Sequence, residues 1–210
     1  MKTYIPERGS NILKYHAKKQ LADFVGTKKV LDFGCGPGYW MEILREFGSK
    51  PIGVDISPDH VKICNQKGFK SFVGGVEYLL KFDSNSFDGI LCSFVIEHLD
   101  RKEIDIMLKN FHRILVPNGI LIINTDNWHS AYKKFFNDYT HKTPFTKTSI
   151  TELVQSKGFK IKKFSYFPTI VKGFGLFSER FPFLTGFLYL FLQLDNIIYK
   201  RNMKLVAEKA

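Results

Sequence analysis

Apolar and polar positions alternate in blocks along the first 127 residues. Short apolar runs, typical of buried strands, occur at 29–33, 52–55, 70–73, 87–94 and 120–124. Segments with apolar residues on one helical face lie between them, at 11–25, 39–47, 58–67 and 100–115. Strands that alternate with helices in this way predict an α/β fold built on a doubly wound, mostly parallel sheet.

Local start and stop signals support these boundaries. Ser57 precedes a proline and is expected to cap the third helix, because proline fits the first helical position. Asp100 and Glu103 have the spacing of a capping box. The Pro-Asn-Gly sequence at 117–119 predicts a turn before the fifth strand.

The pattern loosens after residue 127. Helices are expected at 128–136 and 146–157, and strands at 159–167 and within 197–208. Two late strands joined by a long connection predict a hairpin that closes one edge of the sheet. The connection contains an aromatic-rich stretch at 174–194, which is too short for a bilayer span. It is expected to cap the active site, to contact a second copy, or to dip into a membrane surface.

Charge and aromatic content divide the chain unevenly. Residues 1–127 carry 17 basic and 15 acidic side chains, whereas residues 128–210 carry 14 and 5, within a net charge of +11. The second part also holds 18 of the 32 aromatic residues. We expect one domain over 1–210, with a charge-balanced front half and a basic, aromatic back half. A basic surface favours anionic partners, although a lysine-rich surface without a function gives the same pattern.

The cysteines and the first ten residues indicate the cellular compartment in which we expect the protein. Cys35, Cys64 and Cys92 are odd in number and scattered, with no CxxC and no His/Cys metal spacing. We therefore expect free thiols in a reducing, cytoplasmic setting and no bound metal. The first ten residues contain no apolar run of the secretory type.

Three glycines directly after the first predicted strand are the strongest chemical signal. Gly34, Gly36 and Gly38 follow a G-x-G-x-G spacing, whereas the dinucleotide fingerprint needs its third glycine where Tyr39 stands. Asp32, at the strand end, is poorly suited to a pyrophosphate and well suited to an ammonium group. Both departures favour a ligand with a cationic amine over a nicotinamide dinucleotide.

An acid follows at the end of the second predicted strand. Asp55 lies about 20 residues beyond the glycines, where a carboxylate accepts hydrogen bonds from both ribose hydroxyls. The alternative is an aspartate that only forms the loop or caps the next helix. The glycine loop upstream favours the ribose role.

Several segments in this order resemble the class I S-adenosylmethionine-dependent methyltransferases, over roughly residues 10–160. They are VLDFGCGPG, the acid in VDIS, SFDGILCSFVIEHL and ILVPNGILIINT. The sequence is most similar to the group that contains the quinone-biosynthesis and other small-molecule enzymes. The resemblance implies S-adenosylmethionine as cofactor, and a seven-stranded sheet with an antiparallel last strand. It also implies a cofactor-binding half over 1–127 and a substrate-side half over 128–210.

The resemblance also implies which residues bind the cofactor. They are Asp32, Gly34, Cys35, Gly36, Gly38, Asp55, Ile56, Gly75, Val76 and Ser93. Asp32 matches the acid near the methionine amine, Asp55 the ribose-binding acid, and Ile56 the residue next to the adenine. Gly75 stands where relatives often have an acid for the adenine amine. Adenine recognition is therefore expected to fall to backbone groups or to Glu77.

Two histidines are candidate bases, since an oxygen nucleophile benefits from one. His98 follows the fourth strand, where packing of the turn is the alternative role. His141 lies in a D-x-T-H segment of the loop after the fifth strand, where it is otherwise a surface histidine.

The sequence does not identify the methyl acceptor or the binding partners. We expect O-methylation of a small or lipid-linked molecule, with peripheral contact to an anionic membrane and a homodimer as further possibilities. An RNA methyltransferase ranks second, because residues 93–96 lack the prolines of a base-amino methylation motif. A non-catalytic cofactor-binding protein is a further alternative, and a nicotinamide dehydrogenase fits worst.

Overall fold

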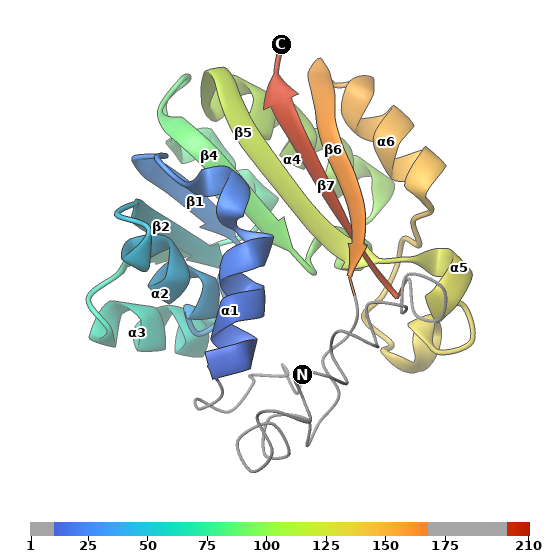
Figure 1. Ribbon diagram of the computed structural model, residues 1–210, viewed down its shortest axis with the longest axis horizontal. Coiled ribbons are helices and arrows are strands. Elements are labelled where there is room, and N and C mark those ends of the chain that lie inside the picture. Colours follow the sequence, from blue (N-terminus) through green and yellow to red (C-terminus); the bar gives the residue numbers. More distant parts are fainter. Residues whose placement is uncertain (1–10, 168–200) are drawn as a thin grey trace.

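A computed structural model describes residues 11–167 and 201–210, and places seven strands in one sheet (Figure 1). They are β1 (Lys29–Phe33), β2 (Lys50–Asp55), β3 (Lys70–Val73), β4 (Phe87–Ser93), β5 (Leu115–Asp126), β6 (Phe159–Phe167) and β7 (Asn202–Lys209). Their order is β3-β2-β1-β4-β5-β7-β6. The first five are parallel, whereas β7 is antiparallel to both β5 and β6. The expected doubly wound sheet with a late hairpin at one edge is confirmed.

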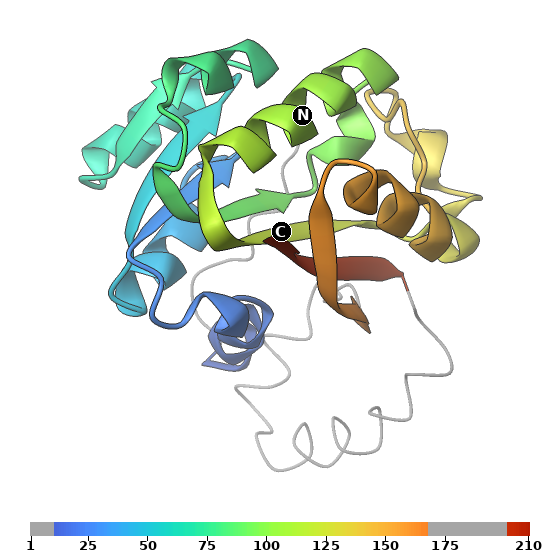
Figure 2. The ribbon, with the colours of Figure 1, turned by 90° about the horizontal axis from the view of Figure 1, so that it is seen from above.

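Helices cover both faces of this sheet (Figure 2). The longer ones are α1 (Asn11–Gln20), α2 (Tyr39–Glu46), α3 (Pro58–Gln66), α4 (Arg101–Ile114) and α6 (Lys147–Gln155). The short ones are α5 (Trp128–Ala131), η1 (Ala22–Phe24), η2 (Val76–Lys81), η3 (Ile96–His98) and η4 (Phe135–Asn137). One apolar cluster packs α4, α6 and η2 against β1, β4 and β5, and a second packs α1 and α2 against the other face. Burial on both faces explains why the central strands are continuous apolar runs.

The predicted helix starts are confirmed. The Ser57 hydroxyl accepts a hydrogen bond from the backbone of His60, with Pro58 in the first helical position. Asp100 accepts from the backbone of Lys102 and Glu103, while the Glu103 carboxylate accepts from the Asp100 backbone. These side chains satisfy backbone N–H groups that the first helical turn leaves unpaired.

Two predicted helices are too long. The segment expected at 11–25 divides into α1 and η1, and the segment at 128–136 holds the four-residue α5 followed by η4. In both places the chain leaves the helix so that an aromatic side chain, Phe24 or Phe135, enters the core. Tertiary packing here overrides the helical periodicity.

The predicted turn at 117–119 lies within a strand. β5 runs from Leu115, and its pairing with β4 jumps from Phe87↔Leu115 to Gly89↔Ile120. Asn118 takes a left-handed φ of 61° in this irregularity, so the turn signal marks a bulge rather than a strand boundary. β4 ends one residue earlier than expected because Phe94 also has a positive φ, of 55°.

Part of the sequence prediction lies outside the described residues. The aromatic stretch at 174–194 belongs there, as do the first residues of the segment expected to hold the last strand. Within 11–167 and 201–210, none of the helices combines the length and apolar character that a bilayer crossing requires.

Candidate functional site

The glycine loop lies at the carboxyl end of β1, and its geometry explains its sequence. Gly34, Gly36 and Gly38 all have positive φ, of 77°, 52° and 89°. A Cβ on Gly34 would lie 2.1 Å from Cγ2 of Val95, whereas a Cβ on Gly36 would meet nothing within 4 Å. The loop therefore packs closely against the protein at Gly34 and is open at Gly36. An open backbone at the carboxyl end of a parallel strand is where such folds bind ligands.

Asp55, at the end of β2, braces this loop. Its Oδ2 accepts a hydrogen bond from the Gly36 amide at 2.8 Å, and its Oδ1 accepts from the Ser57 amide at 2.9 Å. Oδ1 also lies 3.4 Å from Nδ1 of His60, whereas Oδ2 keeps a second lone pair for a ligand hydroxyl. Ile56, beside it, is 76% exposed, which is unusual for a large apolar side chain and suits an aromatic ring of a ligand.

Asp32, beside the loop, is a buried acid whose carboxylate has no polar partner. Its side chain is fully buried, and neither carboxylate oxygen has a hydrogen-bond partner. Burial raises the pKa of Asp32 well above its usual range, and the neighbouring Cys64 and Asp55 raise it further. A cationic amine bound at the loop would supply the missing charge and favour the ionised carboxylate.

Cys35 turns away from the open side of the loop. It is buried with its Sγ 4.0 Å from the Sγ of Cys64, which in turn donates to the Gly36 carbonyl at 3.2 Å. Only its backbone is therefore available to a ligand. The three cysteines are free, as expected, and two that are distant in the sequence lie together in the fold.

In the segment after β3, the acid Glu77 is hydrogen-bonded to a neighbouring backbone amide. Glu77 Oε1 accepts from the Gly75 amide at 2.8 Å, and this hydrogen bond is the main cause of its lowered pKa. Val76 packs on the core, and the Gly74 amide donates to the Asp55 carbonyl at 3.0 Å. The turn is thus tied to the end of β2, next to Ile56.

Ser93 ends β4 next to this region. It is 8% exposed, and its hydroxyl accepts from Asn124 Nδ2 at 3.1 Å. The buried Oδ1 of Asn124 has no partner. The loop with an open face, the two acids and the exposed Ile56 fit a ligand that carries an amine, a ribose and an aromatic base.

Comparison with known proteins agrees with this geometry. Residues 31–123 match a family model described as a methyltransferase domain. A crystal structure of a SAM-dependent methyltransferase from Archaeoglobus fulgidus is 26% identical and superposes with a TM-score of 0.76, covering 96% of each chain. These findings support a class I S-adenosylmethionine-dependent methyltransferase. S-adenosylmethionine is accordingly the cofactor that these similarities imply.

Similar sequences include ubiquinone biosynthesis O-methyltransferases. The protein from Xanthomonas oryzae is 31% identical over 111 residues, which are 50% of this chain and 45% of that protein. The mitochondrial protein from Rattus norvegicus is 28% identical over 134 residues, 59% of this chain and 38% of that protein. This methyltransferase thus matches less than half the length of each of these relatives.

The two predicted catalytic histidines of the methyltransferase lie together. His98 ends η3, directly after β4, and His141 follows η4, yet their ring centroids are 4.6 Å apart. The Lys142 and Thr143 amides both donate to the Glu97 carbonyl, which holds the two segments side by side. β4 and β1 are parallel neighbours, so the two histidines and the glycine loop lie at the same end of the sheet, where these strands have their carboxyl ends.

Glu97 is a third member of this cluster that sequence reasoning did not single out. It is 1% exposed, and its Oε2 accepts from the Thr125 hydroxyl at 3.0 Å. One ligand atom each from Glu97, His98 and His141 lies within 4.8 Å of the others, a grouping able to hold a cation. The sequence expectation of no metal site rested on spacing alone, and spacing does not reveal contacts between segments distant along the chain.

Glu97 should make stability depend on pH. Burial raises its pKa to about 8, from 4.5 for an unperturbed glutamate. Between these values the folded state holds a proton that the unfolded state releases, so the free energy of unfolding should fall as pH rises from 5 to 8. The slope should reach about 1.4 kcal/mol per pH unit and disappear in Glu97→Gln. Urea unfolding of both proteins across this range measures it, and parallel curves would contradict it.

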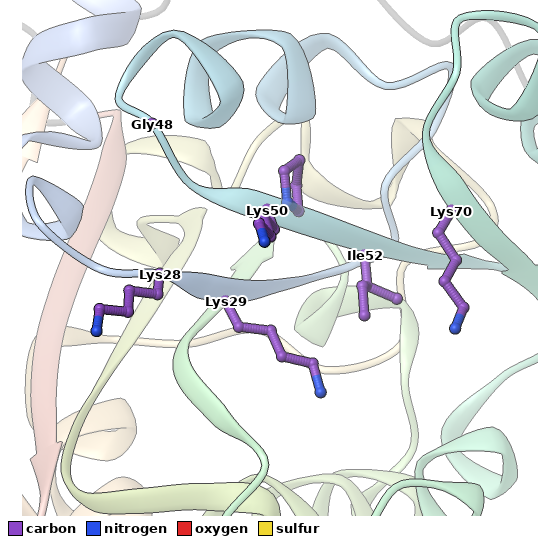
Figure 3. A pocket seen from close by; sticks show the side chains of 7 residues that line it. Lys28, Lys29, Gly48, Lys50, Ile52 and Lys70 are labelled. Carbon is purple, nitrogen blue, oxygen red and sulfur yellow. The ribbon is translucent and has the colours of Figure 1, made fainter.

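A hollow of about 410 Å³ lies at the opposite end of the strands (Figure 3). Lys29, Lys50 and Lys70, which begin β1, β2 and β3, line it together with Lys28. The glycine loop follows the carboxyl end of β1, so this hollow is separate from the candidate site.

Proposed function

We propose that the protein transfers a methyl group from S-adenosylmethionine to an oxygen of a small or lipid-linked acceptor. The observation that carries the proposal is the pair of imidazoles, His98 and His141, at the same sheet edge as the glycine loop. An oxygen nucleophile gains reactivity when a nearby base removes its proton, and histidine is the usual base near neutral pH.

Each residue of the site has its own role in the proposed reaction. S-adenosylmethionine supplies an electrophilic methyl group on a positively charged sulfur. The loop at Gly36 and the carboxylate of Asp55 hold the amino-acid and ribose parts, and Ile56 covers the base. Asp32 balances the charge of the amine. The histidine pair orients the acceptor hydroxyl so that the reactants are aligned for transfer, and one of the two imidazoles takes its proton.

Exposed aromatic side chains next to the histidines support an apolar acceptor. Tyr132, Phe136 and Tyr139 are 52%, 58% and 94% exposed, on the segment that carries His141. Lys133 and Lys134 accompany them. Aromatic and basic side chains together suit the surface of an anionic membrane, from which a lipid-linked substrate is taken. The names of the relatives, which refer to ubiquinone biosynthesis, support the same class of acceptor.

Methyl transfer to hydroxylated aromatic acceptors tests the proposal. Labelled S-adenosylmethionine and a panel of phenols, with and without an isoprenoid tail in anionic vesicles, should identify an acceptor. His98→Gln and His141→Gln should then lower kcat by about 10²-fold or more while affinity for S-adenosylhomocysteine is kept. The exposed His129 provides the matched control, and His129→Gln should leave kcat unchanged. Cofactor binding without transfer to any acceptor would favour the non-catalytic alternative.

A further inference from the structure

We propose that Thr140 and Asp138 form a hydrogen-bonded relay that positions His98, rather than His141, as the proton acceptor of the reaction. The inference rests on the proposed function and adds which imidazole acts and what orients it. Thr140 and Asp138 are positioning residues in this arrangement, since they act through His98.

The hydrogen-bond directions follow from counting protons. Asp138 Oδ1 accepts from the Thr140 hydroxyl at 2.6 Å and from the Thr140 amide at 3.0 Å. A hydroxyl has a single hydrogen, so Thr140 Oγ1 must act as acceptor toward Nδ1 of His98, which lies 2.9 Å away. His98 is therefore protonated at Nδ1, and the lone pair of its Nε2 is free to take a proton.

His141 has a different partner. Its Nδ1 donates to the carbonyl of Phe135 at 2.8 Å, which also leaves Nε2 free. Among the described residues, however, no carboxylate is hydrogen-bonded to His141, directly or through a hydroxyl. A carboxylate at the end of a relay stabilises an imidazolium more than a carbonyl does. The two histidines thus share a tautomer but differ in what orients them: His98 is linked to the Asp138 carboxylate through Thr140, whereas His141 is held by a backbone carbonyl.

The proton balance is simple. The acceptor O–H proton moves to Nε2 of His98 as the new C–O bond forms and the C–S bond of the donor breaks, its electron pair staying on sulfur. Nδ1 keeps its hydrogen, Thr140 keeps its own, and the charge of the imidazolium is balanced by Asp138.

The surroundings of His98 lower its pKa on balance. Burial lowers it most, His141 and Lys142 lower it further, and Asp138 and a hydrogen bond with the Thr140 backbone oppose them. The carboxyl group of Glu97 completes the set of titratable groups around the ring.

Histidine NMR tests the relay without any acceptor. Long-range ¹⁵N correlation spectra of the wild-type protein should show His98 with Nδ1 protonated. Thr140→Val should give a mixture of tautomers, and Thr140→Ser should restore the single form. Asp138→Asn should lower the pKa of His98 below its wild-type value. Thr143→Val is the matched control, because that hydroxyl donates to the Leu99 carbonyl in the same segment and does not reach the ring.

The outcomes separate the relay from the proposed function. A wild-type His98 protonated at Nε2, or an unchanged tautomer in Thr140→Val, overturns the relay whatever the activity. Once a methyl acceptor is identified, Thr140→Val should lower kcat by about tenfold and leave KM for S-adenosylmethionine unchanged. Thr140→Ser should recover most of the lost kcat. Equal kcat values for Thr140→Val and wild type would contradict the relay even if methyl transfer itself is established. The absence of any transfer by the wild type would count against the proposed function alone.

Discussion

Asp55→Ala is expected to lower the affinity for S-adenosylhomocysteine by about 100-fold or more. The carboxylate accepts from the Gly36 and Ser57 amides, so its removal frees the glycine loop from the start of α3. It also removes the proposed acceptor of the ribose hydroxyls. Each hydrogen bond to a charged group contributes about 1.5–3 kcal/mol, and two such losses already account for a 100-fold change. Isothermal titration calorimetry measures the affinity directly.

Two further variants sharpen this experiment. Asp59→Ala removes an exposed carboxylate from the first turn of α3, four residues away, and should leave the affinity unchanged. Asp55→Asn keeps one acceptor oxygen and should fall between Asp55→Ala and wild type. Wild-type affinity in Asp55→Ala would show that the ligand does not bind at the end of β2.

Gly34→Ala is expected to reduce the free energy of unfolding by about 3 kcal/mol. Its φ of 77° is unfavourable for any residue with a Cβ, which costs about 1–2 kcal/mol. The added Cβ would also lie 2.1 Å from Cγ2 of Val95, so the loop or the segment after β4 must shift. Overpacking of this kind costs a further 1–3 kcal/mol or so. Urea unfolding monitored by tryptophan fluorescence gives the difference.

Gly26→Ala isolates the contribution of the clash. Gly26 has a similar φ of 87°, but a Cβ there would meet nothing within 4 Å. This variant should lose only the backbone part, about 1–2 kcal/mol. If both variants lose the same amount, the contact between Gly34 and Val95 is not a constraint on the loop.

Most of the fold could be predicted from the sequence because its signals are local. The bounds of β1, β3 and β6 follow directly from apolar runs between polar neighbours. Ser57 and Asp100 cap their helices through contacts within three residues. The errors at 11–25 and 128–136 arise where Phe24 and Phe135 leave the helical pattern to enter the core, which depends on distant residues.

The candidate site could be predicted only in part, for the same reason. The glycine loop and Asp55 follow strand ends in a fixed order, so their neighbourhood can be inferred from topology. The contact between His98 and Thr140 joins positions 42 residues apart, and no spacing rule anticipates it. Glu97 was missed because a glutamate after an apolar strand gives no sign that it is buried.

The place of β7 within the sheet has a consequence for synthesis on the ribosome. β7 lies between β5 and β6, and in the sheet order β6 has no other neighbour. Until residues 202–209 emerge from the exit tunnel, β5 offers an open apolar edge and β6 has nothing to pair with. The nascent chain therefore reaches its native sheet only after β7 has emerged, and holding factors that cover exposed edges should matter most before that point.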